Sequence, residues 1–257
     1  MTSDDQQVID AQALVIDVFK GLRDELLSVY GKIEHTRKAD FSPVTVYDVK
    51  VEEALKGRLA EAFPDMGFEG EETGASGNHE TYWLVDPIDG TSSFIRGLPF
   101  CTNMAALVHN GVVIAAVIYD FVNDILYTAL KGKGAFKNGE QIHINTTREA
   151  GNLFIYSMTK QKFGHIQEAL DELHIRSLLP VGAAGHSFAM LAEGKIDGLV
   201  NLRYNNRGLH DNAPGMLLVE EAGAITIPYD DETGVNRSQF IVGTPILVDL
   251  IEKSGLL

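Results

Sequence analysis

The sequence contains a single cysteine, Cys101, among its 257 residues. One cysteine cannot form an internal disulfide, and it cannot supply the thiolates of a cysteine zinc site. The sequence also lacks an apolar run of 18 residues, so no segment is expected to span a membrane as a helix. Its first residues lack a basic stretch followed by an apolar one. We therefore expect a cytoplasmic protein without a secretory signal.

Basic residues are few relative to acidic ones, with 21 Lys and Arg against 36 Asp and Glu and a formal net charge of −15. A field of this sign repels the phosphate backbone, which argues against a nucleic acid polymer as a partner. Anionic membrane surfaces are disfavoured for the same reason. Most surplus acidic side chains on a globular protein are solvated surface groups. Only clusters of carboxylates can therefore indicate a cation site.

The apolar pattern divides the chain into two parts of different organisation. Residues 1–150 are predicted to form helices followed by an antiparallel-rich sheet. The expected helices are 8–26 and 46–63, and the expected strands are 81–85, 103–109, 112–119 and 124–129, with turns at Asn110-Gly111 and Asn138-Gly139. Thr45 is the expected N-cap of the second helix, and Gly31 is placed to end the first.

Residues 151–257 are predicted to alternate strands with helices, as α/β units do. The expected strands are 153–157, 196–200, 224–227 and 240–242, and the expected helices are 162–174, 184–193, 211–222 and 245–253. The sequence has no Pro/Ser-rich linker, internal repeat or low-complexity tract between the parts. We expect an N-terminal α+β part and a C-terminal α/β part that pack as one rigid unit.

The most informative motif is the string from Trp83 to Thr91, in which an apolar strand leads to Asp86 and Asp89. Two fixed carboxylates this close repel each other strongly unless a cation lies between them. Mg²⁺ suits one or two carboxylates together with substrate phosphate and water, and the Ile88 carbonyl is a candidate neutral ligand. Asp-Pro and Asp-Gly are also common turn signals. The whole string at the end of a strand nevertheless favours a functional site.

Two other acidic segments are candidates to join these aspartates. Glu71 lies in a Gly- and Glu-rich loop 15 residues before Asp86, and it can fold back to the same point. A solvated acidic loop is the alternative for this segment. Asp211 lies where a helix is expected to begin, so it is either an N-cap, a ligand or both. Gly90 and Thr91 offer backbone N–H groups that can hold an anion.

Three segments in this order resemble the inositol monophosphatase family, which belongs to a superfamily with fructose-1,6-bisphosphatases and phosphoadenosine phosphate phosphatases. They are Gly70-Glu71-Glu72, Asp86-Pro87-Ile88-Asp89-Gly90-Thr91 and Asp211 with Glu221-Ala222-Gly223. The resemblance implies a layered αβαβα sandwich of the sugar phosphatase type, usually a homodimer. It also implies a lithium-sensitive, magnesium-dependent phosphomonoesterase with two or three Mg²⁺ per active site.

The resemblance implies ligand sets for these ions. Glu71, Asp86 and the Ile88 carbonyl resemble the ligands of a first Mg²⁺. Asp86, Asp89 and Asp211 resemble those of a second. Asp48 resembles an aspartate that helps to hold a third ion or its waters, although it could instead close a capping box begun by Thr45. Lys38 resembles a family lysine near the active site, and a basic surface residue is an equal alternative.

The implied mechanism is direct, in-line attack of a metal-activated water on phosphorus. Glu71 and Thr91 would orient or deprotonate that water, Thr91 together with Asp48. No nucleophilic serine or cysteine set is apparent, so no covalent enzyme intermediate is expected. Cys101 has no neighbouring base in the sequence and is expected to be a buried thiol.

The expected substrate is a small phosphorylated metabolite, with inositol 1-phosphate as the family default. The candidate substrate contacts are Gly90, Thr91, Ala184, Asn201 and Asp211. Three positions depart from the family: His210 stands where Trp is frequent, Asn201 where inositol-cleaving members have Glu, and Ala183 where a hydroxyl is common.

These departures leave other substrates open. Histidinol phosphate, fructose 1,6-bisphosphate and 3′-phosphoadenosine-type nucleotides are the alternatives. The loop after Asn201 is about two residues longer than is usual in the family. Its Arg203 and Arg207 could meet a second anionic group, and ordinary surface arginines are an equal alternative. A remote alternative is a non-catalytic, metal-binding regulatory protein. The presence of every expected carboxylate ligand disfavours it.

Overall fold

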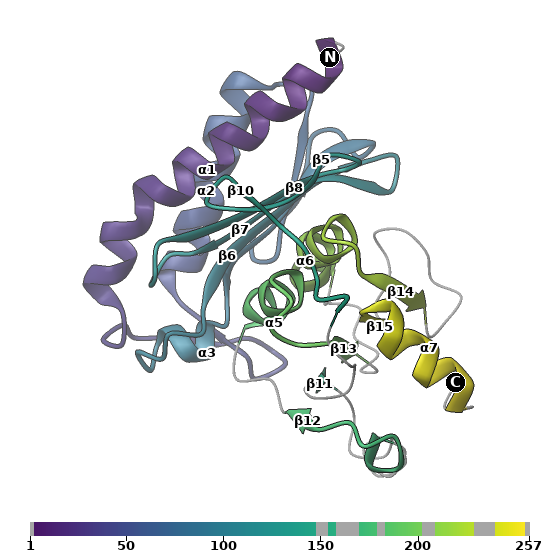
Figure 1. Ribbon diagram of the computed structural model, residues 1–257. Helices are drawn as coiled ribbons and strands as arrows, with labels where there is room; N and C mark the ends of the chain where they lie inside the picture. Colours follow the sequence, from purple (N-terminus) through teal and green to yellow (C-terminus); the bar gives the residue numbers. More distant parts are fainter. Residues whose placement is uncertain are drawn as a thin grey trace.

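A computed structural model describes residues 3–147, 154–157, 170–178, 183–201, 209–228 and 240–254 of the chain. In these ranges helices and sheets alternate in five layers (Figure 1). Two long helices cover an eight-stranded sheet, two further helices lie beneath it, and a five-stranded sheet and a last helix follow. The expected αβαβα sandwich is confirmed.

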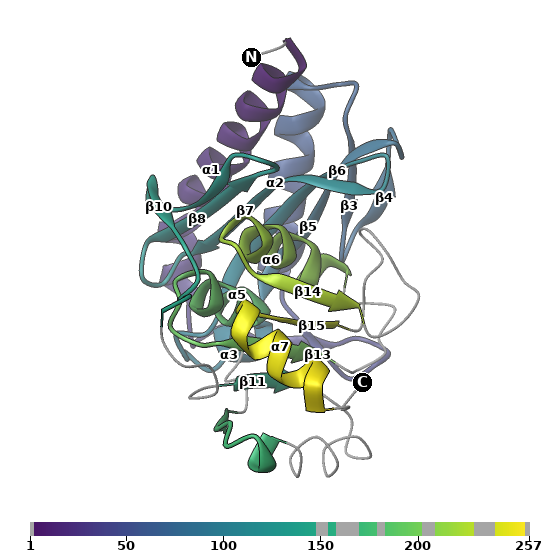
Figure 2. The same ribbon diagram turned by 45° about the vertical axis from the view of Figure 1, so that its right-hand side comes forward.

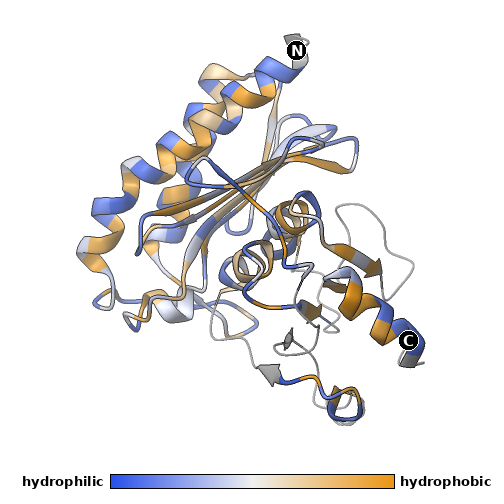
Figure 3. Ribbon diagram, viewed as in Figure 1, coloured by the Kyte–Doolittle hydropathy of each residue, from blue (hydrophilic) through white to orange (hydrophobic). Residues whose placement is uncertain are grey.

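The outer helical layer consists of α1 (Ser3–Val29) and α2 (Val46–Ala62). Each buries an apolar stripe against the large sheet, where Phe19 and Leu55 pack in the same core as Trp83. Figure 3 shows hydrophilic residues on the outward faces of these helices and hydrophobic ones toward the sheet. Both predicted helices are confirmed. Thr45 caps α2, and Gly31 follows α1 with a positive φ of 72°.

The large sheet has the strand order β10-β9-β8-β7-β6-β5-β3-β4. Its strands are β3 (Gly67–Gly70), β4 (Gly74–Ser76), β5 (Thr81–Asp89), β6 (Thr102–His109), β7 (Val112–Asp120), β8 (Ile125–Leu130), β9 (Gly134–Lys137) and β10 (Glu140–Ile142). All neighbours are antiparallel except β3 and β5, which are parallel. The predicted turns at Asn110-Gly111 and Asn138-Gly139 are confirmed, and all four residues have positive φ angles, as tight hairpin turns require.

Strand β5 extends further than the sequence predicts. The apolar run predicts an end at residue 85, yet Asp86 pairs with Met104 and Asp89 with Thr102 across an irregularity in the ladder. The prediction was wrong because backbone pairing with β6 continues past the last apolar side chain. Both aspartates are therefore held by a strand rather than by a free turn.

The second helical layer contains α5 (Ala184–Ala192) and α6 (Leu209–Glu221), which pack side by side under the large sheet. A single apolar core joins strands β6 and β7 to these helices and to the second sheet. Met104, Phe188, Leu218 and Val242 all belong to it. The core therefore includes residues from both sides of position 150.

The five-stranded sheet has the order β12-β11-β13-β15-β14. Its strands are β11 (Phe154–Ser157), β12 (Ser177–Leu178), β13 (Gly198–Asn201), β14 (Ile225–Pro228) and β15 (Phe240–Gly243). Strands β12, β11 and β13 are parallel, whereas β15 runs antiparallel to both β13 and β14. Helix α7 (Pro245–Ser254) covers this sheet in Figure 2. The predicted helix 162–174 falls largely outside the described residues.

Three short elements complete the fold next to the end of β5. Strands β1 (Thr36–Arg37) and β2 (Pro43–Val44) form a small hairpin, and α3 (Thr91–Phe94) begins directly after Asp89-Gly90. Contacts between β2 and α3 hold the hairpin near this turn. Among the helices that the structure describes, none is long and apolar enough to cross a membrane.

Candidate metal centre

Three carboxylates from three elements meet at the end of β5. One oxygen each of Glu71, Asp86 and Asp211 lies within 4.8 Å of the other two. Glu71 directly follows β3, and its N–H donates to the Val85 carbonyl at 3.2 Å, which sets it beside Asp86. Asp211 lies in the first turn of α6, which begins at Leu209, two residues before the predicted start. Segments that are distant in sequence therefore assemble one acidic cluster.

This cluster is electrostatically costly without a cation. Burial raises the pKa of Asp86 well above its ordinary value, and the charges of Glu71, Asp211 and Asp89 raise it further. Burial and the Asp89 charge likewise raise the pKa of Asp211 to about 7. The Oδ1 atom of Asp86 is buried without a hydrogen-bond partner. Hard oxygen donors with an unsatisfied lone pair suit a divalent cation such as Mg²⁺.

Asp89 lies outside the group of three and has a different environment. Its Oδ1 accepts the Ala184 N–H at 2.9 Å, and its Oδ2 accepts the Gly185 N–H at 2.7 Å and the Thr102 hydroxyl at 3.0 Å. These donors place its carboxylate at the N-terminus of α5, where the helix dipole favours negative charge. A carboxylate has lone pairs beyond those three bonds, so it can still bind an ion.

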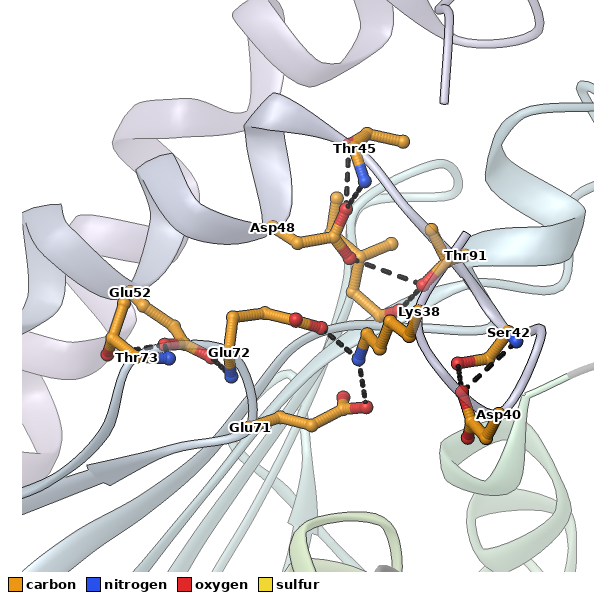
Figure 4. A network of polar contacts seen from close by, with 11 residues as sticks. Lys38, Asp40, Ser42, Thr45, Asp48, Glu52, Glu71, Glu72, Thr73 and Thr91 are labelled. Carbon is orange, nitrogen blue, oxygen red and sulfur yellow. Dashed lines mark hydrogen bonds and ion pairs between the residues drawn. The ribbon is translucent and has the colours of Figure 1, made fainter. Parts of the chain in front are cut away.

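Thr91, Asp48 and the Ile88 carbonyl form a second polar group beside the cluster (Figure 4). The Thr91 hydroxyl lies 3.2 Å from Oδ1 of Asp48 and 3.0 Å from the Ile88 oxygen. The other Asp48 oxygen accepts both the N–H and the hydroxyl of Thr45 at 2.7 Å. The predicted capping box is therefore present. Burial raises the pKa of Asp48 despite these bonds.

The β1–β2 hairpin brings a lysine to the acidic cluster. Lys38 Nζ lies 2.7 Å from Oε1 of Glu71 and also contacts Glu72, as Figure 4 shows. Burial opposes the charge of Lys38, but its bonds to the two glutamates outweigh burial and raise its pKa. Burial raises the pKa of Glu72 to about 7 in spite of this lysine. Of the two sequence interpretations of Lys38, the one near the site agrees with this geometry.

The candidate substrate residues have different environments. Gly90 has a φ of 82°, which an L side chain rarely adopts, and a Cβ there would lie 2.4 Å from the Phe100 oxygen. Asn201 ends β13 and is half-buried. His210 precedes Asp211; both of its ring nitrogens are buried without a partner, and burial lowers its pKa. Arg203 and Arg207 lie outside the described residues.

Sequence reasoning did not identify two polar residues that support this site. The Thr102 hydroxyl donates to Asp89, as described above. The carboxylate of Glu52 accepts the backbone N–H groups of Glu72 and Thr73, in the turn that carries Glu71. Neither stands in a recognisable motif. Glu52 lies next to Val51 on the buried side of α2, and a charged residue at such a position is the only signal that could have marked it.

Comparisons with known proteins agree with the motifs. The model of the inositol monophosphatase family matches residues 4–253. Nus factor SuhB of Xylella fastidiosa is 33% identical over 76% of this chain and 75% of its own length. Inositol monophosphatase 1 of Rattus norvegicus is 32% identical over 74% of this chain and 72% of its own length.

The fructose-1,6-bisphosphatase/inositol-1-monophosphatase of Aquifex aeolicus is 30% identical over 85% of this chain and 83% of its own length. Among solved structures, the extragenic suppressor protein SuhB of Bartonella henselae superposes with a TM-score of 0.83 and 26% identity. The match covers 95% of this chain and 98% of that one. The likeness therefore extends over the whole fold.

Proposed function

Because this chain belongs to the inositol monophosphatase family and is a phosphoric monoester hydrolase, we propose that it hydrolyses a small phosphorylated metabolite with Mg²⁺. The observation that carries this proposal is the cluster of the exposed Glu71, the buried Asp86 and the half-buried Asp211, in which one Asp86 oxygen has no hydrogen-bond partner. Repulsion among buried carboxylates is relieved most directly by a bound divalent cation.

The proposed ligands form two overlapping sets. Glu71, Asp86 and the Ile88 carbonyl would hold one Mg²⁺, and Asp86 would share a second with Asp89 and Asp211. Asp48 would help to hold a third ion or its waters. Bound Mg²⁺ supplies a Lewis acid that acidifies a water, orients the phosphate and neutralises charge on the leaving oxygen.

The chain's own groups would place and deprotonate the attacking water. The Thr91 hydroxyl has one hydrogen, so it can donate to Asp48 or to the Ile88 carbonyl, but not to both at once. Donation to Asp48 leaves the Ile88 oxygen available as a ligand and a Thr91 lone pair available to accept from water. Glu71 is the second candidate to receive the proton.

Removal of the Thr91 hydroxyl tests this role. Thr91→Val keeps the β-branched shape but loses the donor and acceptor, and we expect kcat to fall by about 10²-fold with little change in KM. Thr91→Ser retains the hydroxyl and is the matched control, which should keep most of the activity. Steady-state phosphate release at saturating Mg²⁺ measures both constants. Equal kcat values for Thr91→Val and the wild type would exclude the role.

The proposed substrate contacts fall into two groups. Gly90 and Thr91 would bind the phosphate, while Ala184, Asn201 and Asp211 would face the alcohol portion. Inositol 1-phosphate is the default substrate. Fructose 1,6-bisphosphate is the second candidate, which the dual name of the Aquifex aeolicus relative favours. Histidinol phosphate and 3′-phosphoadenosine-type nucleotides are further alternatives, because Asn201 and His210 depart from the inositol-cleaving pattern.

A panel assay tests the proposed reaction and ranks the substrates. Phosphate release from inositol 1-phosphate, histidinol phosphate, fructose 1,6-bisphosphate and adenosine 3′,5′-bisphosphate is measured with Mg²⁺ and again with EDTA. We expect release from at least one ester, highest with inositol 1-phosphate, and its loss in EDTA. Release that persists in EDTA would reject the metal mechanism. Absence of release from all four esters would favour the non-catalytic, regulatory alternative.

We further propose a cytoplasmic homodimer that lithium inhibits, as the family resemblance implies. Light scattering coupled to size exclusion should give twice the mass of one chain. Full activity in high concentrations of lithium would argue against lithium sensitivity without affecting the phosphatase assignment.

A further inference from the structure

The carboxylate of Glu52 is fully buried on α2, with 0% relative exposure, close to the acidic cluster. Its Oε1 accepts the Glu72 N–H at 2.9 Å. Its Oε2 accepts the N–H of Thr73 at 2.8 Å and the Thr73 hydroxyl at 2.6 Å. A buried carboxylate is stable only when its oxygens are satisfied in this way. All three donors belong to the turn that carries Glu71 (Figure 4).

The turn is thereby fixed from both sides. Before it, the N–H of Glu71 donates to the Val85 carbonyl of β5. After it, the bonds from Glu72 and Thr73 attach the chain to α2 through Glu52. With its backbone held at both ends, the turn directs the side chains of Glu71 and Glu72 to Lys38, as Figure 4 shows.

The residue at position 70 supports the same interpretation. A Cβ added to Gly70 would lie 2.1 Å from Oε2 of Glu52, which is closer than any real contact. Gly70 does not have a positive φ, so the backbone conformation alone does not require glycine there. Glycine at this position instead leaves space for the Glu52 carboxylate to reach the turn.

We propose that Glu52 is a positioning residue that fixes the backbone of residues 71–73, so that the Glu71 carboxylate faces Asp86 and Asp211. This inference rests on the proposed function, in which Glu71 binds a divalent ion. Groups that orient metal ligands typically contribute about 10- to 100-fold to metal affinity. Glu52 accepts its hydrogen bonds from Glu72 and Thr73, so it acts through the chain that holds Glu71.

The test measures metal binding directly rather than turnover. Mn²⁺ is titrated into metal-free protein and free Mn²⁺ is followed by electron paramagnetic resonance, for the wild type, Glu52→Gln and Glu53→Gln. In Glu52→Gln an amide NH₂ faces backbone N–H donors, so we expect Mn²⁺ to bind about 10- to 100-fold more weakly. Glu53 is exposed on the same helix, and Glu53→Gln should bind as the wild type does.

The outcomes separate this inference from the proposed function. A wild type that binds no Mn²⁺ would refute the metal assignment. A wild type that binds Mn²⁺ with the same affinity as folded Glu52→Gln would refute the positioning role and leave the phosphatase proposal intact. A purely structural role would lower the melting temperature without changing Mn²⁺ affinity well below that temperature.

If Glu52→Gln does not fold, a milder pair of variants at Thr73 tests the positioning role. Thr73→Val removes only the hydroxyl donor from an exposed residue, and Thr73→Ser retains it. We expect weaker Mn²⁺ binding for Thr73→Val and wild-type binding for Thr73→Ser. Equal affinities for the two variants would overturn the proposal.

Discussion

Replacement of Asp86 by asparagine is expected to lower Mg²⁺-dependent phosphate release by about 10³-fold or more. Asp86 is the carboxylate that both proposed ligand sets share, so its loss affects two ions at once. Ions in such sites contribute several kcal/mol to transition-state stabilisation, and about 1.4 kcal/mol corresponds to a tenfold change in rate. The measurement is kcat/KM for phosphate release at saturating Mg²⁺.

The same substitution is expected to stabilise the metal-free protein. Without an ion, Asp86 is a buried carboxylate beside two others, and its Oδ1 has no partner. Removing that charge should raise the free energy of unfolding in EDTA at pH 7.5 by about 1–3 kcal/mol. Loss of activity with a gain in stability distinguishes a ligand from a residue that only supports the fold.

An exposed aspartate provides the control for both effects. Asp65 follows Pro64 at the end of α2 and is exposed, so Asp65→Asn should change neither activity nor stability. Wild-type activity in Asp86→Asn would remove the basis for the metal assignment. A large loss of stability in EDTA would contradict the expected relief of repulsion.

The second large expected effect is that the stability of the metal-free protein depends on pH. In metal-free protein the pKa of Asp211 is raised to about 7 by burial and by the Asp89 charge. Its unfolded value is about 3.9, so between about pH 4 and 7 the folded state binds more protons than the unfolded state. Stability therefore falls as pH rises through this window. For Asp211 alone the loss reaches up to about 4 kcal/mol above pH 7.

Saturating Mg²⁺ should offset much of this loss, because ions bind the ionised carboxylates of the folded state. At 100 times its dissociation constant a ligand adds about 2.7 kcal/mol of stability. Urea unfolding at pH 5 and pH 8, in EDTA and in Mg²⁺, measures the effect. We expect Mg²⁺ to stabilise the protein much more at pH 8 than at pH 5. Equal stabilisation at both values would contradict the coupling between the ion and these carboxylates.

The lower limit of pH 5 is chosen because other carboxylates titrate with the opposite sign below it. Burial opposes ionisation of Asp120, but hydrogen bonds from His186 and Asn123 outweigh it and hold its pKa below the ordinary value. That group loses its stabilising effect as pH falls through its folded pKa. Its window lies below about pH 4, so Asp120 stays ionised at pH 5 and at pH 8 and does not affect the comparison.

Local patterns predicted most of the elements. The apolar spacing along α1 and α2 and the Asn-Gly turns of two hairpins are confirmed because each depends on residues close in sequence. The end of β5 was not predictable in this way, because Asp86 and Asp89 are kept in the sheet by pairing with β6. Tertiary pairing outweighed the local turn signal of Asp-Pro-Ile-Asp-Gly.

The centre itself was predictable to the extent that its residues stand in motifs. Glu71, Asp86 and Asp211 were identified from sequence, and they meet as one cluster. The residues around them were harder to identify. Glu52 supports the turn of Glu71 from the preceding helix α2, and only its position on the buried side of that helix distinguishes it from a surface glutamate. Such partners depend on packing between layers, which a single sequence does not reveal.

The bonds of Asp89 to the first amides of α5 have a consequence for how an active molecule is made. Ala184 and Gly185 are separated from Asp89 by 95 and 96 positions along the chain, and Asp211 follows later still. A nascent chain that has completed only the large sheet already carries Glu71, Asp86, Asp89 and Thr102, but it lacks the Ala184 and Gly185 amides and Asp211. If these residues form the proposed site, activity would arise only when the later layers dock, and turnover would report that docking.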